Sequence, residues 1–455
     1  MGQYRSRITP RASLATVGLW MRQEGIWEEV EQRVRVPQKQ VKHSTQDKLL
    51  SALVTILAGG HGVVELDKRL RPDEGLQRAF GLNGCADQSG VSRTLSACNE
   101  ETVAQMQEAL KMIFRHASAA YRHIYEQGAY QVLDVDMTGL PCGDQGEKAT
   151  KGYFAGRRGC RGRQLGRVLA TNYGESVYEH LYTGTVQLEQ SLKELVCGAE
   201  EVLELDAERC RQTIVRVDGG GGTDTDINWL QERGYRVLVK VKNWQRAVKL
   251  CQTVEQWEPD PHIAGRELGW VTKPHTYHQT TRQLGMRWPK GQDAWHYSVI
   301  VSDLDDETLC HLAGCLDKQS LSSQEQMRVM MRAYDMRGGG VETSLRGSKQ
   351  GLGLASRNKR SFAAQQMLTL LAQLAYNIIA WVHQQLAKAT ALFCPYGILR
   401  MVRDVFQING RVRLSLNGQI LCIALSQAHG LAQPFQKALR LSLASNDCVL
   451  ILRKM

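Results

Sequence analysis

Apolar residues recur at helical spacing through the first quarter of the chain. Residues 49–59 are an apolar run that ends at glycine, as buried helices commonly do. Residues 100–114 carry apolar side chains three or four positions apart. Between these two stretches, residues 89–99, with Arg93 near the start, can be either a recognition helix or a plain packing helix. We therefore expect residues 1–120 to be a helical domain of the kind that binds DNA.

The period changes from helical to alternating after residue 120. Residues 131–138 place apolar side chains on one face of a predicted strand and, on the other face, Asp134, Asp136 and Thr138. Two acids on one strand face are costly unless they are solvated or lie against something positive. This strand is therefore the first candidate for a functional position.

The elements that follow have a recognisable order. We predict strands at residues 164–171, 176–183, 213–217 and 235–241, and helices at residues 189–205 and 226–233. With the first strand this gives the order β-β-β-α-β-α-β, which is the layout of an RNase H-like core. The predicted fold class is α/β, or α+β overall, with an RNase H-like mixed sheet and flanking helices.

Five of the nine tryptophans lie in residues 242–321, among strand-like stretches. We predict a β-rich insertion that interrupts the core, in which one tryptophan can stack on an unpaired base. A long buried helix is expected at residues 361–386 and a β-hairpin around Asn409-Gly410. The predicted divisions are an N-terminal DNA-binding domain, a first core part, the insertion, a second core part and a C-terminal unit, at residues 1–120, 121–241, 242–321, 322–393 and 394–455.

Charge and composition narrow the class of partner. The chain of 455 residues has a net charge of +11, which favours a polyanionic partner. Residues 151–167 carry six cations and no acid, and their glycines and aromatic residues favour a nucleic-acid contact over a solvated loop. The 12 cysteines are scattered without a CxxC pair, and no apolar run follows the first residues. We therefore expect an intracellular protein with reduced thiols and no membrane association.

Three acids lie where an RNase H-like core brings strand and helix ends together: Asp136, Asp218 and Glu342. Converging carboxylates cannot all stay ionised unless cations offset their repulsion, and oxygen ligands favour Mg²⁺ or Mn²⁺. Two such ions would suit an in-line phosphodiester displacement. Asp134 shares a strand face with Asp136 and is the alternative first acid.

The third acid lies in a basic setting. Residues 332–360 hold seven cations and two acids. The glycines at 338–340 disfavour helix, so we expect a helix to begin near Val341. On it Glu342, Arg346 and Lys349 share one face. The alternative interpretation of this stretch alone is an exposed helix with an ordinary Glu–Arg pair.

These motifs resemble those of the DDE transposases of bacterial insertion sequences, in the group with a Tyr-Arg-Glu-Lys signature. The resemblance covers nearly the whole chain and rests on three motifs: Asp136-Met-Thr138, Val217-Asp218-Gly-Gly, and Tyr334-x-x-Arg337 with Glu342 and Lys349. Four residues separate Arg337 from Glu342 where the family usually has three, and a glycine bulge could absorb the extra residue.

The resemblance implies a function and its site residues. Asp136, Asp218 and Glu342 would be catalytic and would bind divalent metal. Tyr334, Arg337 and Lys349 would grip DNA phosphates, and Arg346 would face DNA once Glu342 binds metal. The implied activity is cut-and-paste transposition in the bacterial cytoplasm at the nucleoid, by a homodimer acting on double-stranded DNA at transposon ends and target.

Two other functions remain open. The chain can be a catalytically inactive DNA-binding protein derived from a transposase, although all three acids are present. It can also be a helical transcription regulator that uses only residues 1–120, which leaves the three acids unexplained.

Overall fold

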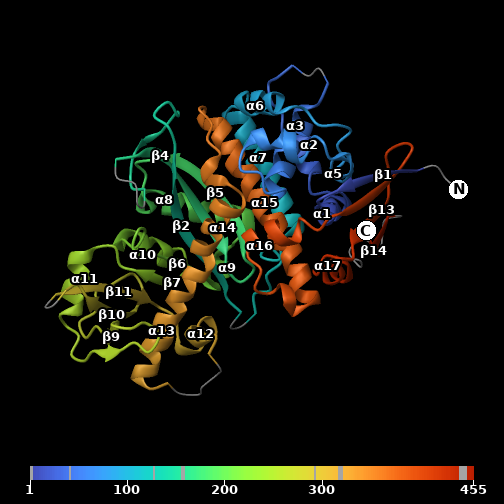
Figure 1. The fold of residues 1–455 in the computed structure, drawn as a ribbon. Coiled ribbons are helices and arrows are strands. Elements are labelled where there is room, and N and C mark those ends of the chain that lie inside the picture. Colours follow the sequence, from blue (N-terminus) through green and yellow to red (C-terminus); the bar gives the residue numbers. More distant parts are fainter. Residues whose placement is uncertain are drawn as a thin grey trace. The chain divides into compact units, whose positions relative to one another are not determined.

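The computed structural model describes residues 4–39, 42–126, 129–154, 159–291, 294–315, 321–439 and 448–454. The chain divides into two compact units. Figure 1 labels the helices and strands along the chain. Unit 1 contains Met1–Ser118, Leu140–Arg163 and Leu345–Met455, and unit 2 contains Ala119–Gly139 and Gln164–Ser344. Both units contain helices and strands, so the fold is mixed α and β, as predicted. The five-part division of the chain stays a prediction.

The helices of unit 1 begin at side chains that cap their free backbone N–H groups. Ser44 forms a capping box with Asp47 at α3 (Thr45–Leu57), and Asp87 and Asn99 cap α6 (Gln88–Ser96) and α7 (Glu100–Ala117). These helices match the predicted ones closely. The remaining N-terminal helices are α1 (Ala12–Gln23), α2 (Glu28–Arg33), α4 (Leu66–Arg69) and α5 (Glu74–Ala79).

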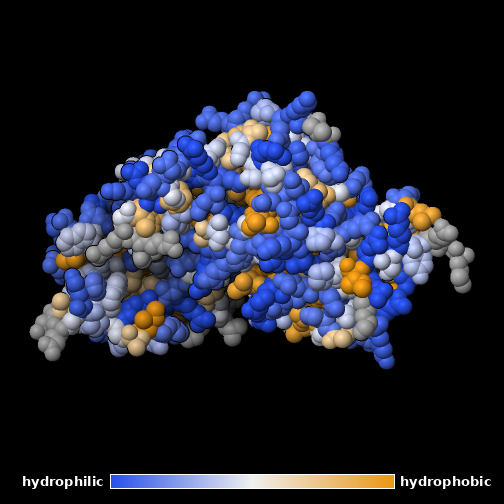
Figure 2. All heavy atoms as spheres, turned by 45° about the horizontal axis from the view of Figure 1, so that its top comes forward, coloured by the Kyte–Doolittle hydropathy of each residue, from blue (hydrophilic) through white to orange (hydrophobic). Residues whose placement is uncertain are grey.

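The centre of unit 1 is the long helix α15 (Phe362–Ala389), which was predicted at residues 361–386. It packs against α3, α6 and α7 and is buried along most of its length. No helix in the described part of the chain is both long and apolar enough to cross a membrane. On the face drawn in Figure 2, hydrophilic residues predominate and the hydrophobic ones form small separate patches.

A four-stranded sheet in unit 1 joins the two ends of the chain. Its order is β1 (Tyr4–Thr9), β12 (Gly410–Ser415), β13 (Ile420–Ser426) and β14 (Val449–Arg453). The first two pairings are antiparallel and the last is parallel. The helix α17 (Ala432–Leu439) connects β13 to β14 in the chain order. The prediction of an all-helical N-terminal segment was therefore wrong for residues 4–9.

The C-terminal hairpin was predicted at the wrong glycine. Its turn lies at Asn417-Gly418, where Gly418 has a φ of +85°, whereas Gly410 begins β12. A Cβ on Gly410 would lie 2.1 Å from the carbonyl oxygen of Ala424 and 2.6 Å from Cβ of Ala12. Glycine is therefore required at position 410 because β12 packs closely there. At position 418 glycine is favoured because the turn needs a positive φ.

The core elements of unit 2 follow one another along the chain in the predicted order β-β-β-α-β-α-β, apart from one additional short helix. In the sheet the strands run β5-β4-β2-β6-β7, with β2 parallel to β6 and β6 parallel to β7. These strands are β2 (Gln131–Pro141), β4 (Arg161–Ala170), β5 (Glu175–Thr183), β6 (Thr213–Val217) and β7 (Arg236–Lys240). The helices α8 (Leu188–Leu203) and α9 (Ala207–Arg211) precede β6, and α10 (Asp224–Glu232) precedes β7. In unit 1, the short β3 (Thr150–Lys151) pairs with the first residues of β4.

The predicted insertion continues this same sheet. From β7 outward the strands are β11 (Trp295–Ser302), β10 (Arg282–Pro289), β9 (Glu267–Trp270) and β8 (Glu258–Pro259). β11 pairs antiparallel with β7 and places Val301 opposite Val239. The segment also contains two helices that were not predicted, α11 (Trp244–Cys251) and α12 (Asp306–Leu312), and α13 (Ser323–Arg337) follows it.

Candidate active site

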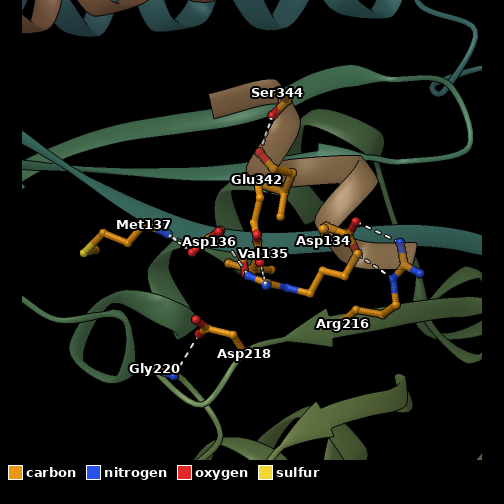
Figure 3. A network of polar contacts seen from close by, with 12 residues as sticks. Asp134, Val135, Asp136, Met137, Arg216, Asp218, Gly220, Glu342 and Ser344 are labelled. Carbon is orange, nitrogen blue, oxygen red and sulfur yellow. Dashed lines mark hydrogen bonds and ion pairs between the residues drawn. The ribbon is translucent and has the colours of Figure 1, made fainter. Parts of the chain in front are cut away.

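Asp134 is bound to Arg216 inside the sheet of unit 2. The two residues lie opposite each other on β2 and β6. Arg216 Nε and Nη2 donate to the two carboxylate oxygens of Asp134 at 2.6 and 2.8 Å, and Thr171 Oγ1 donates to Oδ2 at 2.6 Å. Both side chains are buried. Figure 3 draws the two contacts between them as dashed lines. The carboxylate of Asp134 is therefore occupied by partners inside the sheet, and Asp136 stays the predicted first acid of this strand.

Asp136 lies two residues further along β2, and its side chain is 15% exposed. Its Oδ1 accepts a hydrogen bond from the backbone N–H of Met137 at 2.7 Å. Burial raises the pKa of Asp136 to about 6, and the negative charges of Asp218 and Glu342 add to this rise. Arg337 and the Met137 N–H oppose it. Burial is thus the main reason why the ionised form of Asp136 is disfavoured, and the neighbouring acids add to it.

Asp218 directly follows β6 and is held by the glycine-rich turn behind it. Its Oδ1 accepts a hydrogen bond from the N–H of Gly220 at 2.8 Å (Figure 3). A Cβ on Gly222 would lie 1.8 Å from the carbonyl oxygen of Lys240, so glycine allows the turn to approach β7 closely. Burial lowers the pKa of Lys240 while Asp218 opposes that shift, which places a cation within electrostatic reach of this acid.

Glu342 ends a π-helical turn that joins two α-helices. α13 runs into the π-turn Gly338–Glu342, and α14 (Thr343–Gly351) follows directly. Within the π-turn, Gly340 has non-helical dihedral angles, with φ −85° and ψ −105°. The expected helix start near Val341 is therefore only partly right, because the backbone is already helical before the glycines. The resemblance predicted a glycine bulge between Arg337 and Glu342, and the structure has a break in the helical backbone at Gly340.

Arg337 connects two of the three acids. Its side chain is 3% exposed, and its Nη2 and Nη1 lie 3.2 Å from Asp136 Oδ2 and 3.0 Å from Glu342 Oε1. Nη2 also donates to the carbonyl oxygen of Val135 at 3.3 Å. Burial lowers the pKa of Arg337, but Asp136 and Asp218 outweigh it and the net shift is upward. Arg337 is thus a permanent counter-charge inside the acid cluster.

The acids are suited in type to a divalent metal but are not gathered around one point. Among the residues that the structure describes, no three His, Cys, Asp or Glu side chains lie close enough together to hold a metal ion. Carboxylate oxygens are the ligands that Mg²⁺ and Mn²⁺ prefer. Since the Glu342 side chain is 57% exposed and adjoins the break at Gly340, this acid has room to reorient.

The family of the chain follows from its sequence as a whole. A family profile described as "Transposase DDE domain group 1" matches residues 6–446. The chain belongs to this DDE transposase family. Its domains generally use divalent metals.

Two further comparisons accompany this match. The fold is similar to piggyBac transposase in a cryo-EM structure of its synaptic complex with hairpin DNA. That comparison has a TM-score of 0.47 and 12% sequence identity, and it covers 88% of this chain and 82% of that chain. No curated protein matches this DDE transposase chain by sequence.

The residues predicted to grip DNA in this DDE transposase lie in different settings. Tyr334, on α13, packs against the core of unit 2, and burial raises its pKa. Arg337 faces the acids. Arg346 is exposed and Lys349 is half-buried, and both lie on the part of α14 that belongs to unit 1. Their roles in DNA binding stay predictions.

The basic run at residues 151–167 is largely structural in its second half. Arg163, in unit 1, is buried and donates to the backbone carbonyl oxygens of Glu147, Lys359 and Arg360. Arg167, in unit 2, is buried and pairs with Glu179 at 2.6 Å. The predicted nucleic-acid contact is therefore wrong for both arginines, because their guanidinium groups face the interior. Arg157 and Arg158 lie outside the described residues.

Sequence reasoning missed two cations near the acids, Arg216, which pairs with Asp134, and Lys240, which lies within electrostatic reach of Asp218. The signal was present for Arg216, which is the one charged residue of the strand TIVRV. A charge in the middle of a buried strand requires a buried partner, and Asp134 was already known to need one. Lys240 ends its strand and carried no comparable signal.

Proposed function

We propose that this protein is a DNA transposase that cleaves phosphodiester bonds at terminal inverted repeats and transfers the ends to target DNA. The observation that carries the proposal is the position of Asp136 and Glu342 around one buried guanidinium, that of Arg337, which lies 3.2 Å from Asp136 Oδ2 and 3.0 Å from Glu342 Oε1. Asp136 within β2, Asp218 directly after β6 and Glu342 at the end of the helical turn supply carboxylate oxygens, the ligands that Mg²⁺ and Mn²⁺ prefer. Membership of a DDE transposase family supports the same reaction class.

In this proposal Asp136, Asp218 and Glu342 hold Mg²⁺ or Mn²⁺, with two ions as the expected number. Bound divalent cations would activate an attacking water or 3′-hydroxyl and stabilise the leaving oxygen. Side chains near the acids would bind the substrate and hold the strands in place. Arg337 and Lys240 supply fixed positive charge where a phosphodiester would enter, and Asp134 with Arg216 holds β2 and β6 in register.

The finer features follow the predicted subgroup. We infer that Tyr334, Arg337, Arg346 and Lys349 contact DNA as a Tyr-Arg-Glu-Lys signature would. The substrate would be double-stranded DNA at the element's ends and at the target. The assembled complex would be a homodimer, working at the nucleoid of a bacterial cytoplasm.

The testing experiment is cleavage of a supercoiled plasmid that carries the genomic segments flanking the coding sequence. Wild type is compared with Glu342→Gln in Mg²⁺, Mn²⁺ or EDTA. Glu255→Gln is the matched control, because Glu255 is an exposed acid of the same unit. Metal-dependent double-strand excision by wild type and Glu255→Gln, but not by Glu342→Gln, is the expected result. Cleavage that survives Glu342→Gln would show that Glu342 is not the third ligand.

The second candidate is a catalytically inactive DNA-binding protein descended from a transposase. It is favoured by the arrangement of the acids, of which two are paired with Arg337 instead of gathered around one point. Specific binding of the flanking segments by wild type, with no cleavage in either metal, would support this candidate and reject the enzyme.

A further inference from the structure

The four-stranded sheet of unit 1 has one covered face. Its inner side chains are buried against α1, α5 and α17, and they include Val412, Leu414, Ile423, Leu425 and Leu450. Side chains alternate between faces along each strand, so the remaining positions form the opposite, outer face. The pairing register of the four strands identifies the residues of this outer face.

The outer face is assembled from all four strands. Tyr4, Ser6 and Ile8 of β1 lie opposite residues 415, 413 and 411 of β12. The same rows continue across β13 and β14. By this register the outer face contains Tyr4, Ser6, Ile8, Arg411, Arg413, Ser415, Cys422, Ala424, Ser426, Val449, Ile451 and Arg453. Its three β13 residues, Cys422, Ala424 and Ser426, are small and buried.

This face is basic and partly apolar. It holds three arginines, and among the described residues of these four strands no acid lies on it. Three of its apolar or aromatic side chains are strongly exposed: Tyr4 at 54%, Ile8 at 72% and Val449 at 54%. A solvated sheet face would normally mix both signs of charge with few exposed apolar residues.

The neighbouring arginine on the inner face shows the contrast. Arg7, in the same strand β1, points to the covered side and forms an ion pair with Glu74 of α5 at 2.5 Å. On the outer face, the Arg413 guanidinium lies 5.2 Å from the ring centroid of Tyr4. Burial raises the pKa of Cys422, and the charges of Arg413 and Arg453 oppose that rise, so both cations act on the middle of this face.

We propose that this outer face binds the phosphate backbone of duplex DNA, as a contact surface separate from the acid cluster. The inference rests on the proposed function only in taking DNA as the polyanion. An unbalanced group of arginines matches a dense line of phosphates, and alternate positions on β12 set Arg411 and Arg413 about 7 Å apart, on one side of one strand. Tyr4, Ile8 and Val449 supply flat apolar surface for contact with sugars.

The test uses the full chain in a Glu342→Gln background, so that binding is measured without cleavage. The probe is a fluorescent 30-base-pair duplex of arbitrary sequence, titrated between 50 and 300 mM salt. The test variant carries Arg411→Gln, Arg413→Gln and Arg453→Gln. The matched control carries Arg33→Gln, Arg71→Gln and Arg403→Gln, which remove the same charge from exposed arginines paired with acids.

We expect the test variant to bind more weakly and its slope of log affinity against log salt to be less steep by about 2 to 3, because each phosphate contact contributes about 0.9. The control should keep the wild-type slope. Circular dichroism melting confirms that both variants fold. An unchanged salt slope in the test variant would overturn the inference. So would a second result: if sedimentation shows that wild type is a dimer and the test variant a monomer, while the DNA affinity per protomer stays the same, the face joins two copies of the chain.

The two proposals fail in different experiments. If the plasmid assay shows no metal-dependent cleavage while the test variant loses its salt slope, the face binds DNA and the enzymatic proposal is wrong. If cleavage occurs and the slope does not change, the enzyme stands and this surface has another role.

Discussion

The guanidinium of Arg337 lies 3.2 Å from the carboxylate of Asp136, in a cluster of acids that are candidates for binding metal. The same guanidinium reaches Glu342 at 3.0 Å. In the free protein this arginine supplies the positive charge that a divalent cation would supply in the loaded site. Arg337 and a bound cation would therefore compete for the same two carboxylates.

The first prediction follows from this competition. Arg337→Gln should bind Mn²⁺ more tightly than wild type, by roughly threefold to tenfold, because one opposing charge is removed from the cluster. The dissociation constant for Mn²⁺ is measured by titration calorimetry or from the electron paramagnetic resonance signal of free Mn²⁺. Arg332→Gln, an exposed arginine of the same helix, is the control. Weaker Mn²⁺ binding by a folded Arg337→Gln would mean that the arginine holds the acids in place for the metal.

The second prediction concerns stability without metal. The pKa of Asp136 is raised from an ordinary 3.8 to about 6, so its ionised form destabilises the fold at neutral pH. Asp136→Asn should raise the free energy of unfolding at pH 7.5 by roughly 1 to 3 kcal/mol. The gain should shrink as the pH falls from 6 to 4, where wild-type Asp136 becomes protonated in the fold. Urea unfolding at several pH values tests it, with the exposed Asp144→Asn as control, and an equal gain at pH 4 would contradict the assignment.

The third prediction separates the two acids of β2. Asp134→Asn should lower the free energy of unfolding by about 3 to 5 kcal/mol, because it leaves Arg216 as a buried charge without a full partner. The opposite signs expected for Asp134→Asn and Asp136→Asn, measured side by side at pH 7.5, distinguish a structural from a functional carboxylate. The double variant Asp134→Leu with Arg216→Met should recover part of the loss.

The fourth prediction concerns the π-turn. A Cβ on Gly340 would lie 2.5 Å from Asp134 Oδ2 and 3.0 Å from Thr171 Cγ2, whereas a Cβ on Gly339 meets nothing within 4 Å. Gly340→Ala should lower the free energy of unfolding by about 1 to 3 kcal/mol and reduce metal-dependent cleavage. Gly339→Ala should leave cleavage intact and stability equal or slightly higher, since alanine favours helix. Equal behaviour of the two variants would show that the turn tolerates a side chain at either position.

The fifth prediction addresses DNA binding by α14. Lys349→Ala should weaken binding to the element's ends and reduce the salt slope by about 1, while Mn²⁺ affinity stays the same. Fluorescence anisotropy with an end duplex and a parallel Mn²⁺ titration give both readings. Retained end affinity in Lys349→Ala would remove this lysine from the DNA contacts.

Sequence patterns predicted those helices and strands that are determined by residues close together in the chain. The alternation of apolar and polar residues around Asp134 and Asp136 predicted the strand β2. The apolar stretch before Asp218 predicted the strand β6, with Asp218 directly after it. The helical turn at Gly338–Glu342 was not predictable from propensity, because three glycines in a row disfavour helix. Gly340 packs closely against Asp134 and Thr171, which belong to distant segments. The contact of Asp134 with Arg216 joins two strands far apart in the chain, so the sequence indicated that each charge needs a partner but not which one. The contact of Arg337 with Asp136 likewise joins distant segments.

The pairing of β1 with β12 bears on the order in which a growing chain can fold. Residues 4–9 leave the ribosome about four hundred positions before the strand that they pair with. All of unit 2, with its three candidate metal ligands, has been synthesised by then. Until residues 410–415 arrive, β1 is an unpaired edge, and the arginine-bearing face does not exist. A chain interrupted before β12 would thus carry the acids intact but lack the surface that we propose for holding DNA, so that surface is completed only after the acid cluster.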